Sequence, residues 1–470
     1  MNFYDLIQML GQNIWIYGGS LVVVLSVLVF VHEWGHYIVA RMCGVRVEQF
    51  SIGFGKEIYG FTDKAGTRWK ISMIPLGGFV QMFGDTDPAS AGHSGEVEED
   101  GESREMTEAE KKVAFYTKPV WKRSLIVVAG PAINYIFAIF LLSGLYFYNG
   151  QPVSPPTAAG VMVGSSAEQY GFKPHDYIIS IDGKTIDDFS DIRREMMVAL
   201  DQEKHFVIKR EGQIVEIDAK PKRVPMEDRF GFKSESGVLG LISADQGILI
   251  SRIGSINGVS YDNEEDIISE IKNRMDTTFT IGFKPRKKES KEGEDAKIRE
   301  LIIKPVGSKN IDLGQLRDDD SIKEVLYLSD MPQKQFKPHT MMTAVQTAIV
   351  ESYVMTVSSL EALWQMVVGI RSATELGGIV RIGAIAGDMA VKGIVPFILL
   401  TALLSINLGF INLLPIPMLD GGHLMFYAIE SVIGKPVSEQ VQEYAFRAGF
   451  VFLIGIMAFA NLNDIYQLIT

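Results

Sequence analysis

Four long runs without charged side chains constrain this chain more than any other feature. They cover residues 14–31, 124–149, 393–419 and 448–463. A helix that crosses a bilayer needs about 20 mostly apolar residues, so the last run is the weakest candidate. In hydrocarbon every backbone amide and carbonyl must be paired within the chain, which a helix achieves. The sequence therefore predicts a multi-pass α-helical membrane protein with four transmembrane helices.

The composition adds water-soluble parts to this membrane core. The chain has 470 residues, of which 47% are hydrophobic and 22% are charged, and its formal net charge is -12. An acidic balance argues against general nucleic-acid binding. The single cysteine, Cys43, excludes an intrachain disulfide and a cysteine-based zinc cluster. The first ten residues contain no Lys or Arg, so we expect no cleavable signal peptide.

Basic residues beside the apolar runs predict the orientation. Arg41 and Arg46 follow the first run, and Lys118, Lys122 and Arg123 precede the second. Because Lys and Arg favour the cytoplasmic side, this loop is predicted to be cytoplasmic. Both termini and the large section between the second and third runs are then extracytoplasmic.

The cytoplasmic loop is predicted to begin with a β-hairpin. Residues 50–61 and 67–84 are rich in aromatic and β-branched residues, as is typical of paired strands. Four glycines in them indicate bends or close backbone approach, and these are Gly53, Gly55, Gly77 and Gly78. Residues 94–112 are strongly charged and are expected to be flexible and solvated.

The extracytoplasmic section carries a repeated pattern. Residues 164–196 read as small residues, a turn, the strand "YIISI", an Asp-Gly turn and an amphipathic helix. Residues 247–274 repeat the later half as a strand, an "ING" turn and a helix. These segments resemble tandem PDZ domains of α+β type, although His175 stands where that pattern has Gly. Residues 340–370 are predicted to form an amphipathic helix on the outer membrane face, with a fifth span as the alternative.

The predicted segments follow from these patterns. They are transmembrane helices at 1–42, 123–149, 393–420 and 444–466, cytoplasmic parts at 43–122 and 421–443, PDZ domains at 153–224 and 230–308, and an outer linker with amphipathic helices at 309–392.

A candidate metal site lies at the end of the first run. His32, Glu33 and His36 form the pattern H-E-x-x-H. Residues i and i+4 share one face of a helix, so both imidazoles can bind one cation. Glu33 can take a proton from water that zinc activates. Ionisable groups beside lipid are costly, which favours a functional role for all three.

A catalytic zinc ion needs a third protein ligand and an open position. Asp420 is the candidate, because it follows a long uncharged run and begins an Asp-Gly-Gly turn. His423 is the competing candidate. The first and third spans both run from outside to inside, so His32 and Asp420 are predicted to lie at the same depth, near the cytoplasmic face.

The H-E-x-x-H pattern in a first span and N-x-x-P-x-P-x-x-D-G in a later one resemble the site-2 protease family of intramembrane zinc metalloproteases, peptidase family M50. The resemblance covers nearly the whole chain. It implies a bacterial inner-membrane protease that cuts single-pass membrane proteins, of which an anti-sigma factor is typical and remnant signal peptides are a further class. It implies that the glycine-rich hairpin is associated with the membrane and pairs with substrate, and that Asn412, Pro415 and Pro417 shape the substrate site. Ile379 departs from the family pattern, which usually has Pro there.

Two other functions fit parts of the sequence. A divalent-metal transporter also places His and Asp within the membrane. A catalytically retired scaffold would act only through peptide ligands of its PDZ domains. Glu33 argues against the transporter, since ion transport needs no water-activating base at that spacing. The intact set of four polar residues argues against the scaffold.

Overall fold

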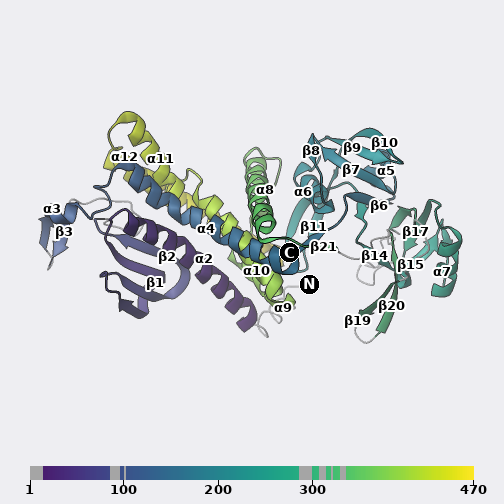
Figure 1. Cartoon of the computed structure of the whole chain (residues 1–470), viewed down its shortest axis with the longest axis horizontal. Helices are drawn as coiled ribbons and strands as arrows, with labels where there is room; N and C mark the ends of the chain where they lie inside the picture. The colour runs from purple at the N-terminus through teal and green to yellow at the C-terminus, as the bar shows by residue number, and fades with distance from the viewer. Residues whose placement is uncertain are drawn as a thin grey trace. The chain divides into compact units, whose positions relative to one another are not determined.

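The computed structural model describes residues 14–84, 96–99, 102–284, 299–305, 314–318, 321–328 and 335–469. Residues 1–13 lie outside the described residues, as do parts of the charged segment 94–112 and residues 285–298 of the predicted second PDZ domain. The chain divides into two compact units (Figure 1). The first comprises Met1–Tyr148, Glu227–Lys233 and His339–Thr470, and the second comprises Asn149–Met226 and Ser234–Pro338.

The first unit contains four helices of the described chain that are long and apolar enough to cross a membrane. They are α2 (Ile14–Met42), α4 (Val120–Asn149), α10 (Ile394–Asn412) and α12 (Glu439–Ile469). Large apolar side chains remain uncovered on them, such as Phe140 and Val451. Exposed apolar surface of this kind marks contact with lipid or with another protein. The remaining elements of this unit are β3 (Glu96–Glu99), β4 (Glu102–Glu105), α3 (Glu108–Lys111), α8 (Met341–Val367), η2 (Ala373–Glu375), α9 (Ile379–Lys392) and α11 (Asp420–Ile433), together with the hairpin strands β1 and β2.

The third apolar helix is shorter than its sequence predicted. Helix α10 ends at Asn412, whereas the predicted span continued to Asp420. Pro415 and Pro417 follow, and proline cannot continue a helix because it lacks an amide N–H. The chain crosses this connection in non-helical conformation, and Asp420 becomes the first residue of α11. The aspartate therefore sits at the start of a new helix and not at the end of the old one.

The predicted hairpin is present. Strands β1 (Val47–Thr62) and β2 (Arg68–Met82) pair antiparallel, with Thr62 opposite Arg68 beside the turn. Both strands pack against α2 (Figure 1). Gly53 has φ of 89° and Gly77 has φ of 119°, conformations that L side chains rarely adopt. A Cβ at Gly53 would lie 2.7 Å from the carbonyl oxygen of Ile74, so the facing strands approach closely there.

The second unit is rich in β-structure. Its strands are β5 (Gln151–Val153), β6 (Thr157–Met162), β7 (Asp176–Ile181), β8 (Lys184–Thr185), β9 (Lys204–Arg210), β10 (Gln213–Ala219), β11 (Lys222–Glu227), β12 (Lys233–Val238), β13 (Leu241–Ser243), β14 (Gly247–Leu249), β15 (Ile253–Ile256), β16 (Val259–Ser260), β17 (Phe279–Phe283), β18 (Glu300–Ile303), β19 (Gly314–Asp318), β20 (Ser321–Tyr327) and β21 (Gln335–Lys337). Its helices are α5 (Ser166–Gln169), α6 (Phe189–Ala199), η1 (Ile250–Arg252) and α7 (Glu264–Asn273). Ten strands form one sheet in the order β10-β9-β7-β6-β18-β17-β15-β16, with β13 and β8 beside β6 and β7.

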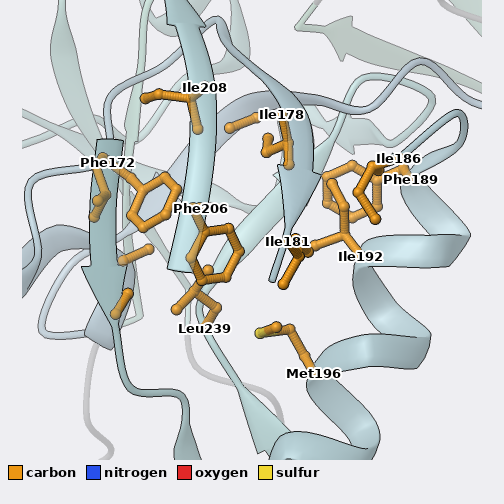
Figure 2. Packing of buried hydrophobic residues seen from close by; sticks show 14 of the residues in the cluster. Phe172, Ile178, Ile181, Ile186, Phe189, Ile192, Met196, Phe206, Ile208 and Leu239 are labelled. Carbon is orange, nitrogen blue, oxygen red and sulfur yellow. The ribbon is translucent and has the colours of Figure 1, made fainter. Parts of the chain in front are cut away.

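Two hydrophobic cores lie on this sheet. The first packs Phe172, Phe206 and Ile181 against the apolar face of α6 (Figure 2). The second consists of Ala159 and of buried residues between 244 and 328, among them Ile253 and Phe279. The two halves are joined because β18 pairs with β6. Two cores agree with two repeated segments, and the assignment of each segment as a PDZ domain stays a prediction.

The departure at His175 in the first repeat is visible in the backbone. His175, which stands where the resemblance expects Gly, has φ of 72°. This left-handed conformation costs a residue with a Cβ roughly 1–2 kcal/mol. Next to it Asp176 is fully buried and receives two hydrogen bonds from Arg210, which raise the pKa of the guanidinium. This paired charge fixes the turn to strand β9.

Candidate metal centre

Helix α2 presents two histidines to one point. His32 and His36 are one turn apart on the same face, and their Nε2 atoms lie 3.3 Å from each other. Helix α4 passes directly over this face. A Cβ at Gly130 would clash with the imidazole of His36 and would lie 2.9 Å from Cε1 of His32. Glycine at this position therefore makes room for both rings.

The third candidate ligand comes from the far end of the sequence. Oδ2 of Asp420 lies 3.3 Å from Nε2 of His32, and Oδ1 lies 3.6 Å from Nε2 of His36. The connection after α10 delivers this carboxylate through a tight turn, in which a Cβ at Gly421 would clash with the carbonyl oxygens of Leu413 and Leu414. Met418 in the same turn has φ of 83°. Strain of this kind is concentrated at functional sites.

The three side chains fit a zinc ion. Zinc takes nitrogen and oxygen ligands at about 2.0–2.2 Å in a tetrahedron, which sets the ligand atoms roughly 3.3–3.5 Å apart. The two Nε2 atoms lie 3.3 Å apart, and a different oxygen of Asp420 approaches each of them, at 3.3 Å from His32 and 3.6 Å from His36. With one ligand atom taken from each residue, the three atoms lie within 4.8 Å of one another. Oδ2 of Asp420 is buried and makes no hydrogen bond within the described part of the chain. Such an atom is costly unless a cation satisfies it.

The other nitrogen of each imidazole is also engaged. Nδ1 of His36 lies 2.9 Å from the carbonyl oxygen of Ile126, to which it can only donate. This contact places the proton on Nδ1 and leaves the lone pair of Nε2 directed at the common point. Nδ1 of His32 lies 3.0 Å from the side-chain amide of Asn134. Both partners belong to α4.

Glu33 lies on the wall of the same cavity. The cavity measures about 590 Å³, and its lining includes all three candidate ligands. Asn412 and Gly78, two of the residues predicted for substrate binding, line it as well. His423, the competing candidate for the third ligand, also lines the cavity, and its ring centroid lies 4.8 Å from that of Phe446.

The remaining predicted residues lie beside the cavity and not in its lining. Gly53, Gly55 and Gly77 shape the hairpin, whereas Phe54 between the first two lines the cavity. Pro415 and Pro417 lie in the connection to Asp420. A Cβ at Gly449 of α12 would clash with the carbonyl oxygen of Pro417, so that connection is packed against α12.

Two residues of α4 were missed by sequence reasoning. Gly130 and Asn134 contact the histidines but lie inside an uncharged run that reads simply as a membrane span. Asn134 could have been identified from its amide, because a polar side chain within an apolar membrane helix usually has a hydrogen-bonding partner.

Comparison of the sequence with known proteins identifies its family. The profile of peptidase family M50 matches residues 20–456. A protein of Agrobacterium fabrum named as a zinc metalloprotease is 34% identical over 448 residues, which is 95% of each chain. The metalloprotease MmpA of Caulobacter vibrioides is 30% identical over 462 residues, covering 95% of this chain and 94% of its own. The regulator of sigma E protease of Haemophilus influenzae is 31% identical over 473 residues, covering 96% and 98%.

Proposed function

The chain belongs to peptidase family M50 and is an integral membrane zinc metalloendopeptidase, and we propose that it cleaves single-pass membrane proteins within their membrane segment. The observation that carries the proposal is the gathering of His32, His36 and Asp420 with Glu33 around one cavity. All four candidate membrane helices contribute to the lining of this cavity together with the hairpin, which supports access for a substrate from the membrane.

We assign the chemistry to four side chains. His32, His36 and Asp420 would hold zinc, which when bound would supply Lewis acidity toward a carbonyl and lower the pKa of water. Glu33 accepts the proton of the attacking water and later donates it to the leaving amine. Asn412, on the cavity wall, positions the substrate backbone.

The hairpin is proposed to hold substrate as an added strand. Within the described chain residues 49–52 of β1 pair on one side with 68–71 of β2 and on the other with 78–81, so the open edges belong to residues 57–62 and 78–82. An extended peptide can add to such an edge through backbone hydrogen bonds, which is the form a protease must present to its site. Several apolar side chains of the hairpin are exposed, among them Ile58 and Met73. Their exposure supports association of the hairpin with the membrane.

The substrate class is proposed from one relative. The name of the Haemophilus influenzae protein concerns regulation of sigma E. We propose a substrate of the anti-sigma factor type, already trimmed outside the membrane, whose helix unwinds locally to reach the cavity. Remnant signal peptides have the same chemistry and form a second group. The sheet-rich unit is proposed to comprise two PDZ domains that filter substrates by size or bind a peptide.

The proposed orientation puts the hairpin turn in the cytoplasm and the sheet-rich unit outside, in the bacterial inner membrane. Replacing Cys43, the one cysteine in the sequence, with Ser gives a background for labelling. A cysteine at Lys184 should react in intact cells with a membrane-impermeant maleimide, and one at Lys64 should react only after lysis. The reverse pattern would overturn the orientation.

The function is tested with purified protein in liposomes that contain a single-pass reporter lacking its outer domain. Glu33→Gln is expected to lower cleavage by about 10²- to 10⁴-fold, because the general base is lost. Zinc content should stay at the wild-type level, since Glu33 is not a ligand.

The control is Glu439→Gln, a change to an exposed glutamate at the start of α12, which should leave cleavage unchanged. Mass spectrometry should place the new termini within the membrane segment of the reporter. Unchanged cleavage by Glu33→Gln would sink the assignment. Zinc flux into the liposomes without cleavage would favour a transporter.

A further inference from the structure

The side chain of Asn134 has no assigned role in the reaction, yet it touches a candidate zinc ligand. It lies on α4, is fully buried, and places its amide nitrogen Nδ2 3.0 Å from Nδ1 of His32. Its other end, Oδ1, is buried and has no hydrogen-bond partner in the described part of the chain.

The tautomer of His32 decides which end of the amide must face it. A neutral imidazole carries one proton, and a metal needs the lone pair of the other nitrogen. If Nδ2 donates to Nδ1, the proton of His32 sits on Nε2 and blocks the metal. If the carboxamide is turned by half a rotation, Oδ1 accepts from Nδ1–H, and the lone pair of Nε2 is free.

The orientation of the amide and metal binding are therefore linked. We propose that Asn134 is a positioning residue for the zinc site: its Oδ1 accepts the Nδ1 proton of His32 and thereby holds the tautomer and ring orientation that metal binding requires. The proposal rests on the assignment of His32 as a ligand. It makes the two histidines equivalent, because Ile126 accepts the Nδ1 proton of His36 in the same way.

The backbone fixes Asn134 in place for this task. The hydroxyl of Ser405 on α10 donates a 2.8 Å hydrogen bond to the carbonyl oxygen of Asn134 and is fully buried. Helix α4 therefore carries one acceptor for each histidine, a backbone carbonyl and a side-chain carboxamide. A partner to the remote nitrogen of a histidine ligand orients the ring and raises its basicity.

The test measures zinc affinity by competition with a chelator in the purified full-length protein. Asn134→Leu keeps the size of the side chain but removes the acceptor, and it should weaken zinc binding by about 10- to 100-fold. Asn134→Asp restores an acceptor and should keep affinity at or above the wild-type level. Gly144→Ala, on the same helix at a position where a Cβ meets no atom within 4 Å, should leave it unchanged.

A purely structural role predicts the opposite order. A buried carboxylate would then disturb packing more than leucine, so Asp would be the worse substitution. Equal affinity of Asn134→Leu and wild type would overturn the inference, as would an Asp variant as weak as the Leu variant. Thermal unfolding of the zinc-free variants monitors folding separately. A wild-type protein without zinc affinity would instead overturn the proposed metal site itself.

Discussion

The side chain of Gly130 is a single hydrogen atom, which leaves room for the imidazoles of His32 and His36 to face one ion. A methyl group there would overlap the ring of His36 and press on that of His32. The imidazoles cannot retreat freely, because Nδ1 of each is held by a partner on α4. The residue opposite the metal ligands is therefore as constrained as the ligands.

We predict that Gly130→Ala loses most of its bound zinc, measured by elemental analysis of the purified protein. Gly144→Ala is the matched control, because it lies in the same helix and a Cβ there meets no atom within 4 Å. It should retain zinc and gain slightly in helix stability, since alanine is favoured over glycine in helices by roughly 1 kcal/mol. Equal zinc content in both variants would contradict the account of the site.

At the scale of single residues, the sequence predicted those site residues whose spacing along a helix places them on one face. His32 and His36 are recognised because one helical turn brings them together. Gly130 and Asn134 carry no such spacing, and only the packing of α4 on α2 reveals them. The third ligand could be proposed from the sequence, but its distances to the histidines depend on a turn that no pattern specifies.

Among the elements, the hairpin is the one that we propose holds the substrate, and its backbone geometry makes that proposal testable. Gly53 and Gly66 share a left-handed backbone, with φ of 89° and 85°. They differ in their surroundings: a Cβ at Gly53 would press on the carbonyl of Ile74, while one at Gly66 would meet nothing within 4 Å. Alanine substitutions at the two positions therefore separate the effect of backbone strain from the effect of a close contact between the strands.

We predict that Gly53→Ala reduces cleavage of the reporter much more than Gly66→Ala, with zinc content unchanged in both. Alanine at either position is strained by roughly 1–2 kcal/mol. Only at Gly53 must the paired strands also move apart beside the cavity. A similar loss in both variants would show that strain alone matters, and full activity of Gly53→Ala would remove the hairpin from substrate binding.

Two features of the elements, the end of α10 and a long-range strand pairing, are not indicated by hydropathy. Hydropathy alone carries the apolar run up to residue 419, whereas Pro415 and Pro417 indicate a break in the helix, and α10 ends before them at Asn412. In the sheet-rich unit each repeat was recognisable, but the pairing of β6 with β18 joins segments far apart in sequence. Such long-range pairings leave no local signal, so one shared sheet could not be predicted.

On the scale of the whole molecule, the site is assembled from both ends of the sequence. His32 lies in the first apolar helix and Asp420 follows the third, with the entire sheet-rich unit between them in sequence. A buried ion pair between Arg123 and Glu430, 2.7 Å apart, joins the start of α4 to α11, the helix that begins with Asp420. A zinc ion bound by His32 and Asp420 is thus expected to link two helices that lie far apart in the sequence.

The most direct test of this account is the zinc content of purified wild-type protein, Asp420→Ala and His423→Ala, after equal exposure to a weak chelator. We predict that wild type and His423→Ala keep one zinc ion per chain, because the ligand set is intact. Asp420→Ala should lose it, since two imidazoles alone hold zinc weakly. Retention of zinc by Asp420→Ala together with its loss from His423→Ala would contradict the proposed metal centre.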